Sequence, residues 1–161
     1  MDSRDHNLTQ TLQLHSEHLF DTAIPVLEPL QLGDIPKGNR RIRVAQEGEF
    51  SGKRLCGKIL SGGTNWLLVR PDGVAELDVR LNLESSDGAL IHMRSEGFLH
   101  FPPESAKQVL AGRADPSEYY LRERTVFETA AEAYYWLNSI VAVGVGWYRP
   151  GLVGMSIYEI K

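Results

Sequence analysis

The chain has 161 residues, with 17 Lys or Arg and 21 Asp or Glu, which gives a formal net charge of −4. This composition fits one globular domain and predicts no sequence-wide attraction to nucleic acid or to a membrane surface. The single cysteine, Cys56, excludes an internal disulfide and a metal site built from several cysteines.

The first part of the chain is polar and then becomes strand-like. Residues 1–13 lack the apolar core of an export signal, so we expect a polar N-terminal extension and a cytoplasmic protein. Residues 14–161 show no linker and are expected to form one domain. Residues 14–32 predict one or two strands interrupted by prolines, and a turn-rich stretch follows over 33–39.

Short β-type runs fill most of the remaining chain. They cover residues 40–50, 54–61, 64–70, 74–84, 89–99, 119–129, 133–138, 140–148 and 152–160. One segment has a helical pattern, which Pro103 opens and Gly112 ends. Many short strands and one short helix predict a mainly β fold, a single-domain antiparallel β-barrel, because closure removes exposed strand edges.

Turn chemistry predicts which residues face each other across the strands. A three-residue loop at 86–88, with Gly88 in the left-handed conformation, pairs Leu83 with Ile91. The same register aligns two charged pairs, Asp78 with Glu96 and Arg80 with Arg94. A similar loop at 71–73 pairs Trp66 with Asp78, and a two-residue loop at Gly62-Gly63 would pair Ile59 with Trp66.

The two faces of this predicted sheet differ in kind. One face is nearly uniform hydrocarbon and indicates packing: Leu60, Leu67, Val69, Leu77, Val79, Leu81, Ile91 and Met93. The other face combines Trp66 and Phe98 with the charged cluster, as a ligand-binding surface does. We expect Trp66 and Asp78 to project together into a sheltered hollow. The alternative is a solvated outer face with cross-strand ion pairs.

Asp78 and Glu96 are the strongest candidates for catalytic acid and base residues. Two facing carboxyl groups beside an indole would raise one pKa and so provide an acid and a base. Arg80 and Arg94 would oppose that shift, and a structural ion-pair cluster is therefore the alternative.

Tyr120 and Arg122 share one face of the next strand and could hold a carboxylate or enolate oxygen. Packing of the arginine on an aromatic ring is the alternative. Trp136 and Asn138 alternate along the expected strand 133–138, where Trp136 would form a wall. Asn138 could orient a carbonyl or bond to nearby backbone.

The predicted catalytic residues are therefore Asp78, Glu96 and Tyr120, and the predicted ligand-binding residues are Trp66, Arg80, Arg94, Arg122, Trp136 and Asn138. We expect no metal site, because His15 and His18 would lie on opposite faces of a strand. The sequence also lacks dinucleotide and phosphate-binding motifs, so we expect no cofactor.

Several motifs in fixed order resemble one protein family. They are NWLLVRPDGVAELDVR at 65–80, DGALI at 87–91, DPSEYYLR at 115–122, FET at 127–129, YWLN at 135–138 and YEI at 158–160. Together they resemble the domain of unknown function 3237 family, also called uncharacterised protein family 0311. Leu81 stands where the family would carry an aromatic residue, and Glu96 matches no family position. The resemblance implies a mostly bacterial, soluble antiparallel β-barrel, often oligomeric, with no generally assigned activity.

These observations favour a barrel that binds a small, partly hydrophobic or aromatic organic molecule. A cofactor-free enzyme that transfers protons, by isomerisation, elimination, dehydration or cyclisation, is the catalytic form of this hypothesis. The alternatives are a non-catalytic carrier and a structural subunit of a homo-oligomer that buries the aromatic face between chains.

Overall fold

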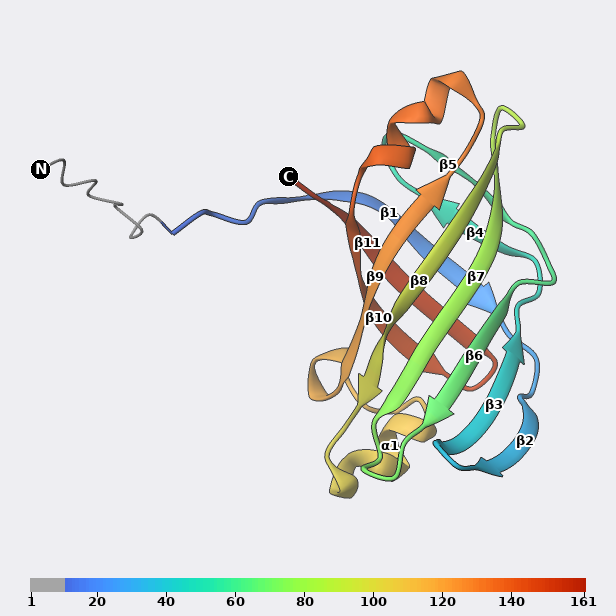
Figure 1. The fold of residues 1–161 in the computed structure, drawn as a ribbon, viewed down its shortest axis with the longest axis vertical. Coiled ribbons are helices and arrows are strands. Elements are labelled where there is room, and N and C mark those ends of the chain that lie inside the picture. The colour runs from blue at the N-terminus through green and yellow to red at the C-terminus, as the bar shows by residue number, and fades with distance from the viewer. Residues whose placement is uncertain (1–10) are drawn as a thin grey trace, which may run out of the picture.

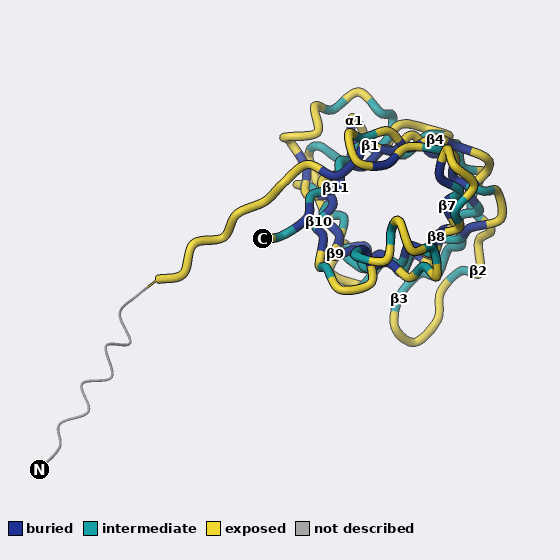
Figure 2. Tube along the Cα trace, turned by 90° about the horizontal axis from the view of Figure 1, so that it is seen from above, coloured by how far each residue is buried: buried dark blue, intermediate teal, exposed yellow. Residues whose placement is uncertain are grey.

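The computed structural model describes residues 11–161, in which one antiparallel sheet closes on itself (Figure 1). Its strands are β1 (Ser16–Pro25), β2 (Leu30–Ile35), β3 (Gly38–Val44), β4 (Gly48–Ser51), β5 (Cys56–Ile59), β6 (Thr64–Val69), β7 (Ala75–Ser85), β8 (Leu90–His100), β9 (Tyr120–Glu128), β10 (Ala142–Arg149) and β11 (Leu152–Ile160). The closed ring is visible when the chain is seen from above (Figure 2).

The barrel closes because β7 has neighbours on both edges. One edge pairs with β8, and the ring continues through β9, β10, β11, β1, β4 and β5 back to β7. The other edge of β7 is shared, since its first half pairs with β6 and its last residues pair with β5. From β6 the sheet extends through β3 to β2. The predicted single-domain antiparallel barrel is therefore confirmed.

The register predicted between β7 and β8 is also confirmed. Leu83 pairs with Ile91 and Asp78 pairs with Glu96. Gly88 has φ 87° in the connecting loop, the left-handed conformation that favours glycine. Three-residue loops of this kind thus set which side chains meet.

The pairing predicted between Ile59 and Trp66 is wrong. Ile59 pairs with Gly48 on one side and with Leu83 on the other. Trp66 instead pairs with Ile42 of β3. The Gly62-Gly63 segment does not close a two-residue hairpin, because the Gly62 amide donates to the Ala45 carbonyl at 2.9 Å and directs the chain toward β3.

The expected helix begins at Pro103 as a 3₁₀ turn, η1 (Pro103–Ser105), and continues as α1 (Ala106–Leu110). A second short turn, η2 (Pro116–Glu118), precedes β9.

The strand expected over 133–138 is wrong, because residues 132–139 form the 3₁₀ helix η3 (Glu132–Ser139). Tyr134 and Leu137 are three residues apart, a spacing that places both on one side of a 3₁₀ helix, and both contact the core. The turn expected over 33–39 is shorter, since β2 and β3 continue to Ile35 and from Gly38.

The core lies inside the barrel. Leu81, Leu83 and Met93 are buried there, and Phe20 of β1 packs edge-on against Phe127 of β9 at 6.0 Å between ring centroids. α1 lies at one end of the barrel and η3 at the other (Figure 1). Within residues 11–161, no helix has the length and apolar character needed to cross a membrane.

Candidate functional site

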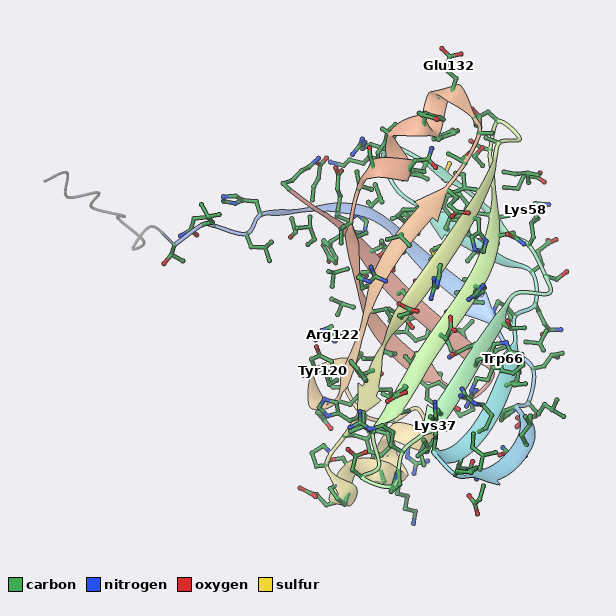
Figure 3. All side chains as sticks on the ribbon, viewed as in Figure 1. Lys37, Lys58, Trp66, Tyr120, Arg122 and Glu132 are labelled. Atoms are coloured by element: carbon green, nitrogen blue, oxygen red, sulfur yellow. The ribbon has the colours of Figure 1, made fainter. Side chains whose placement is uncertain are left out.

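The predicted site residues of β6, β7 and β8 lie on the outer surface of the barrel. Trp66 is 45% exposed, and the Asp78 side chain is 41% exposed. Trp66 and Asp78 do share one side of the sheet, as predicted, but that side faces outward. The expectation of a sheltered hollow is therefore wrong, because closure turns the hydrocarbon face inward. Figure 3 shows Trp66 on the outside, with Tyr120 and Arg122 on a different part of the surface.

A shallow depression remains on this outer face. Its lining combines residues from four strands: Arg40, Trp66, Glu76, Leu77, Asp78, Glu96, Gly97 and Phe98. Glu96 forms ion pairs with Arg94 and with Arg124, the latter at 2.9 Å. Hydrogen bonds from Arg124 and then Arg94 hold the pKa of Glu96 below its ordinary value. This direction is opposite to the raised pKa expected of a catalytic acid in a paired-carboxylate site.

Asp78 and Arg80 are neighbours in this outer cluster. The Arg80 Nε atom lies 3.7 Å from Asp78 Oδ1, which is an ion-pair distance but not a hydrogen bond. Arg94 Nε and Asp78 Oδ1 are both buried and have no hydrogen-bond partner within residues 11–161. The ion pairs of this cluster thus run along each strand, between Arg80 and Asp78 and between Arg94 and Glu96, with Arg124 of β9 as a second partner of Glu96.

Tyr120 and Arg122 are separated from Trp66 by the width of β7 and β8. The Arg122 guanidinium carbon lies 5.2 Å from the centre of the Tyr120 ring, and that ring stacks on His100 with 4.8 Å between centroids. These contacts are the packing arrangement considered as the alternative to an oxyanion site. Neither residue lines a cavity with Asp78.

Trp136 and Asn138 belong to η3, at the end of the barrel. Asn138 accepts a hydrogen bond from the Thr129 amide at 2.8 Å and donates to the Thr129 carbonyl at 2.9 Å. Its side chain therefore holds η3 against the end of β9. Trp136 lies under Arg54, whose guanidinium carbon is 3.6 Å from the ring centre, and Arg54 also pairs with Glu159.

The barrel interior contains a different candidate site, a partly open cavity of about 250 Å³. Its wall is mostly apolar and includes Leu77, Leu81, Met93 and Leu121, with Val109 of α1. A few polar groups interrupt this wall: Arg41, Arg43, Thr64, Asn65, Glu123 and Tyr148. An apolar cavity with a few converging polar groups is the usual form of a small-molecule site.

Glu123 is the acidic group of this cavity and is 7% exposed. Burial raises the pKa of Glu123 to about 7, and a hydrogen bond from Ser95 acts in the opposite direction. Glu123 pairs with Gly97 on β8 and with Gly144 on β10. A Cβ atom at Gly97 would come within 1.9 Å of the Arg122 carbonyl oxygen, so glycine is required for this close strand approach. A Cβ atom at Gly144 would meet the Met155 and Ile157 side chains, so both cross-strand neighbours of Glu123 are glycines at closely packed positions.

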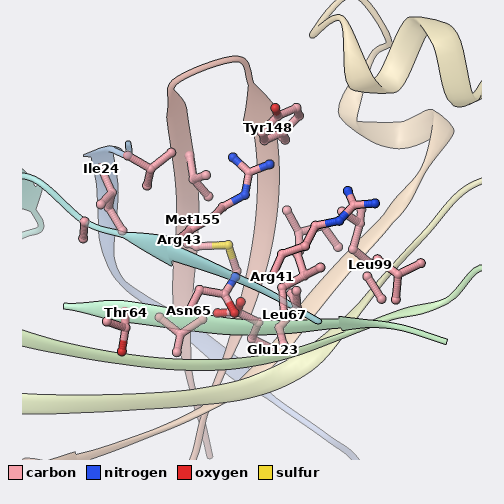
Figure 4. Close-up of a pocket in the computed structure, with 18 of the residues that line it drawn as sticks. Ile24, Arg41, Arg43, Thr64, Asn65, Leu67, Leu99, Glu123, Tyr148 and Met155 are labelled. Atoms are coloured by element: carbon pink, nitrogen blue, oxygen red, sulfur yellow. The ribbon is translucent and has the colours of Figure 1, made fainter. Parts of the chain in front are cut away.

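Arg41 and Arg43 lie two residues apart on β3, and both extend toward the cavity (Figure 4). The Arg43 guanidinium carbon lies 5.1 Å from the centre of the Tyr148 ring. Arg41 donates from Nε to Asn39 Oδ1 at 2.9 Å. Asn65 is the register partner of Arg43, and its Oδ1 atom is buried without a hydrogen-bond partner within residues 11–161.

Sequence reasoning missed these interior residues. Glu123 carries a readable signal, because it interrupts the alternating inward residues Leu121 and Phe127, and an acid on an apolar face is informative. Arg41 and Arg43 carry no such signal. Arg40 precedes them on the opposite face, so arginine occurs on both sides of β3 and alternation cannot separate them.

No group of three or more His, Cys, Asp or Glu side chains within residues 11–161 is arranged to hold a metal ion. The polar groups that the cavity wall does offer are one carboxyl group, two guanidinium groups, an amide and hydroxyl groups.

Comparison with known proteins identifies relatives along nearly the whole chain. A protein from Clostridium acetobutylicum, described as a UPF0311 protein, is 32% identical over 157 residues, which are 96% of this chain and 99% of that protein. A crystal structure of a conserved protein of unknown function from Rhodopseudomonas palustris has a TM-score of 0.89 at 26% identity, covering 94% of this chain and 100% of that one. A β-barrel-like protein from Acinetobacter baumannii has a TM-score of 0.82 at 33% identity, covering 95% of this chain and 99% of that one.

A more distant structure shares only the fold. It is an enzyme from Penicillium herquei, with a TM-score of 0.72 and 18% identity, covering 95% of this chain and 98% of that one. Residues 14–160 match the model of the family described as "Protein of unknown function (DUF3237)". The relatives share this chain's barrel along almost their entire length, and the chain belongs to the DUF3237 family.

Proposed function

We propose that the barrel binds a small, largely apolar organic molecule in its interior cavity and that Glu123 exchanges a proton with it. The observation that carries this proposal is a buried carboxyl group, with a pKa of about 7, on the wall of a 250 Å³ apolar cavity. Such a group is present in both its acid and its base form near neutral pH, as general acid–base catalysis requires.

The surroundings of Glu123 support this role. Water is a poor competitor in an apolar cavity, so a carboxylate there is weakly solvated and is a stronger base toward a bound molecule. Its carboxyl group has no ion-pair partner within 4.0 Å among residues 11–161 that would hold it ionised. The proposed chemistry is proton abstraction and return, as in isomerisation or elimination, without a cofactor.

The proposal can be tested with a nitrobenzisoxazole, a small probe that reports on a desolvated base. The carboxylate takes the ring C–H proton, the C–H electron pair forms the nitrile, and the N–O bond breaks to release a coloured nitrophenolate. We expect the full-length protein to accelerate this elimination, with a rate that rises with pH through about 7, because the ionised form of Glu123 is the base.

Two variants give the decisive comparison. Glu123→Gln removes the base but keeps the shape of the side chain, so the rate should fall by about 100-fold or more. Val79→Trp fills the cavity from β7 and should also abolish the acceleration. Asn82→Trp, on the outward face of the same strand, is the matched control and should retain the wild-type rate. An unchanged rate in Glu123→Gln would refute the role of Glu123.

The outer depression is the second candidate, because Asp78 lines it and its Oδ1 atom is buried without a hydrogen-bond partner within residues 11–161. A donor group of a ligand could satisfy this atom. The same assay distinguishes the two sites. A rate lost in Asp78→Asn but kept in Glu123→Gln would assign proton transfer to the outer face and exclude the interior site.

A further inference from the structure

We infer that the molecule bound in the cavity carries a carboxylate on a largely apolar body, and that Arg41 and Arg43 hold this carboxylate. The inference rests on the proposed function, since it names the class of ligand that the interior cavity takes.

Arg41 and Arg43 both line the interior cavity. Residues two apart on a strand point to the same face, so both guanidinium groups reach the cavity from β3 (Figure 4). Arg40, between them and the turn, points away and donates to the Trp66 carbonyl at 3.0 Å. The alternation of side chains along β3 therefore directs Arg41 and Arg43 inward, and their direction does not depend on which rotamer each one adopts.

The charge balance of the cavity favours an anionic ligand. Neither Arg41 nor Arg43 has a carboxylate within 4.0 Å among residues 11–161. The carboxyl group on the cavity wall, Glu123, is partly protonated near neutral pH and so does not neutralise two permanent positive charges. Half-buried charges without a counter-ion are unfavourable, and an anionic ligand would supply the missing one.

The guanidinium groups of Arg41 and Arg43 are suited to binding a carboxylate. Arg41 uses its Nε atom to bond Asn39, and Arg43 rests on the Tyr148 ring. Both contacts fix the side chains while leaving terminal N–H groups to donate. Arginine binds carboxylates through two parallel hydrogen bonds, which gives both affinity and orientation.

The rest of the cavity wall has a polar part and an apolar part. Asn65 lies beside Arg43 on the next strand and lines the same cavity, where its amide Nδ2 group can donate to a carboxylate held by the arginines. Leu81, Met93 and Leu121 offer only hydrocarbon and a thioether. The cavity therefore has a cationic, hydrogen-bonding part and an apolar part, which suits a ligand with a charged head and an apolar body.

The test compares two probes of nearly equal shape, naphthoate and its neutral amide, naphthamide, by thermal unfolding and calorimetry with the full-length protein. Wild type should bind naphthoate with a Kd at least about tenfold lower than that of naphthamide. Arg41→Gln and Arg43→Gln should each weaken naphthoate binding far more than naphthamide binding and so remove most of this preference. Arg43→Lys keeps the charge but loses the planar fork, so an intermediate affinity is expected.

The outcomes separate this inference from the proposed function. If both probes bind equally well and Val79→Trp abolishes both, the cavity is a binding site but the carboxylate inference is overturned. If neither probe binds wild type, proposed interior binding fails and the inference fails with it. A preference for naphthoate that persists in both glutamine variants would also overturn the assignment to Arg41 and Arg43. Asn82→Trp, whose side chain points outward, is the control for folding.

Discussion

Replacing Glu123 by glutamine should change how the stability of the protein depends on pH. Burial raises the pKa of Glu123 from an ordinary value of 4.5 to about 7. At about 1.4 kcal/mol for each pKa unit, ionising this buried group costs the folded state roughly 3 kcal/mol. The amide of the Glu123→Gln variant cannot ionise, so the variant avoids this cost.

The direction of the effect follows from proton binding. Because the folded pKa is raised, the folded state binds more protons than the unfolded state between pH 4.5 and about 7. Glu123 therefore destabilises the wild type progressively as pH rises through this window, and the loss is complete above about pH 7. Glu123→Gln should gain up to about 3 kcal/mol relative to wild type between about pH 4.5 and about pH 8.

Urea unfolding at a series of pH values measures this difference, since the free energy of unfolding is obtained at each pH. In thermal melts, the same gain corresponds to roughly 6–12 °C for a chain of this size. Glu128→Gln is the matched control, because Glu128 lies exposed on the same strand. Parallel stability profiles for wild type and Glu123→Gln would refute the reasoning, because they would show that Glu123 titrates as an exposed carboxyl group does.

Three further predictions concern the scaffold, each measured by urea unfolding. Leu83→Ala should lose about 2–5 kcal/mol, because Leu83 is fully buried and leaves a cavity; a loss below about 1 kcal/mol, near the value for surface sites, would contradict its place in the core. Gly97→Ala should destabilise by about 1–3 kcal/mol, since its Cβ would meet the Arg122 carbonyl oxygen; a neutral effect would contradict the close strand approach. Asn138→Ala should lose about 1–2 kcal/mol and loosen η3, whereas Asn138→Asp should keep the bond from the Thr129 amide and recover part of the loss.

Local sequence signals were sufficient for the two hairpins that are closed by the loops at 71–73 and 86–88. The glycine at position 88 requires a left-handed conformation, and with the loop length fixed, Leu83 has to meet Ile91. Alternation then sorts the residues of β7 and β8 into two sets. The match to the family model covers residues 14–160 and so includes every strand of the barrel.

Local signals failed where a pattern had two physical explanations. The YWLN segment fits a strand by composition, but Leu137 and the backbone bonds of Asn138 stabilise a 3₁₀ helix at the end of the barrel. Trp66 beside charged residues predicts a lined hollow, yet exposed apolar side chains are common because polar groups cannot cover a whole protein surface.

The sequence by itself determined which residues share a face, because a strand alternates its side chains with a period of two whatever its surroundings. It did not determine which face lies inside. That choice depends on closure of the ring, through pairings such as β1 with β11 that join residues far apart in the chain, as in Thr22 with Met155. Only the closed barrel brings Arg41, Asn65 and Glu123 to one cavity, since they lie on separate strands whose meeting no local pattern encodes.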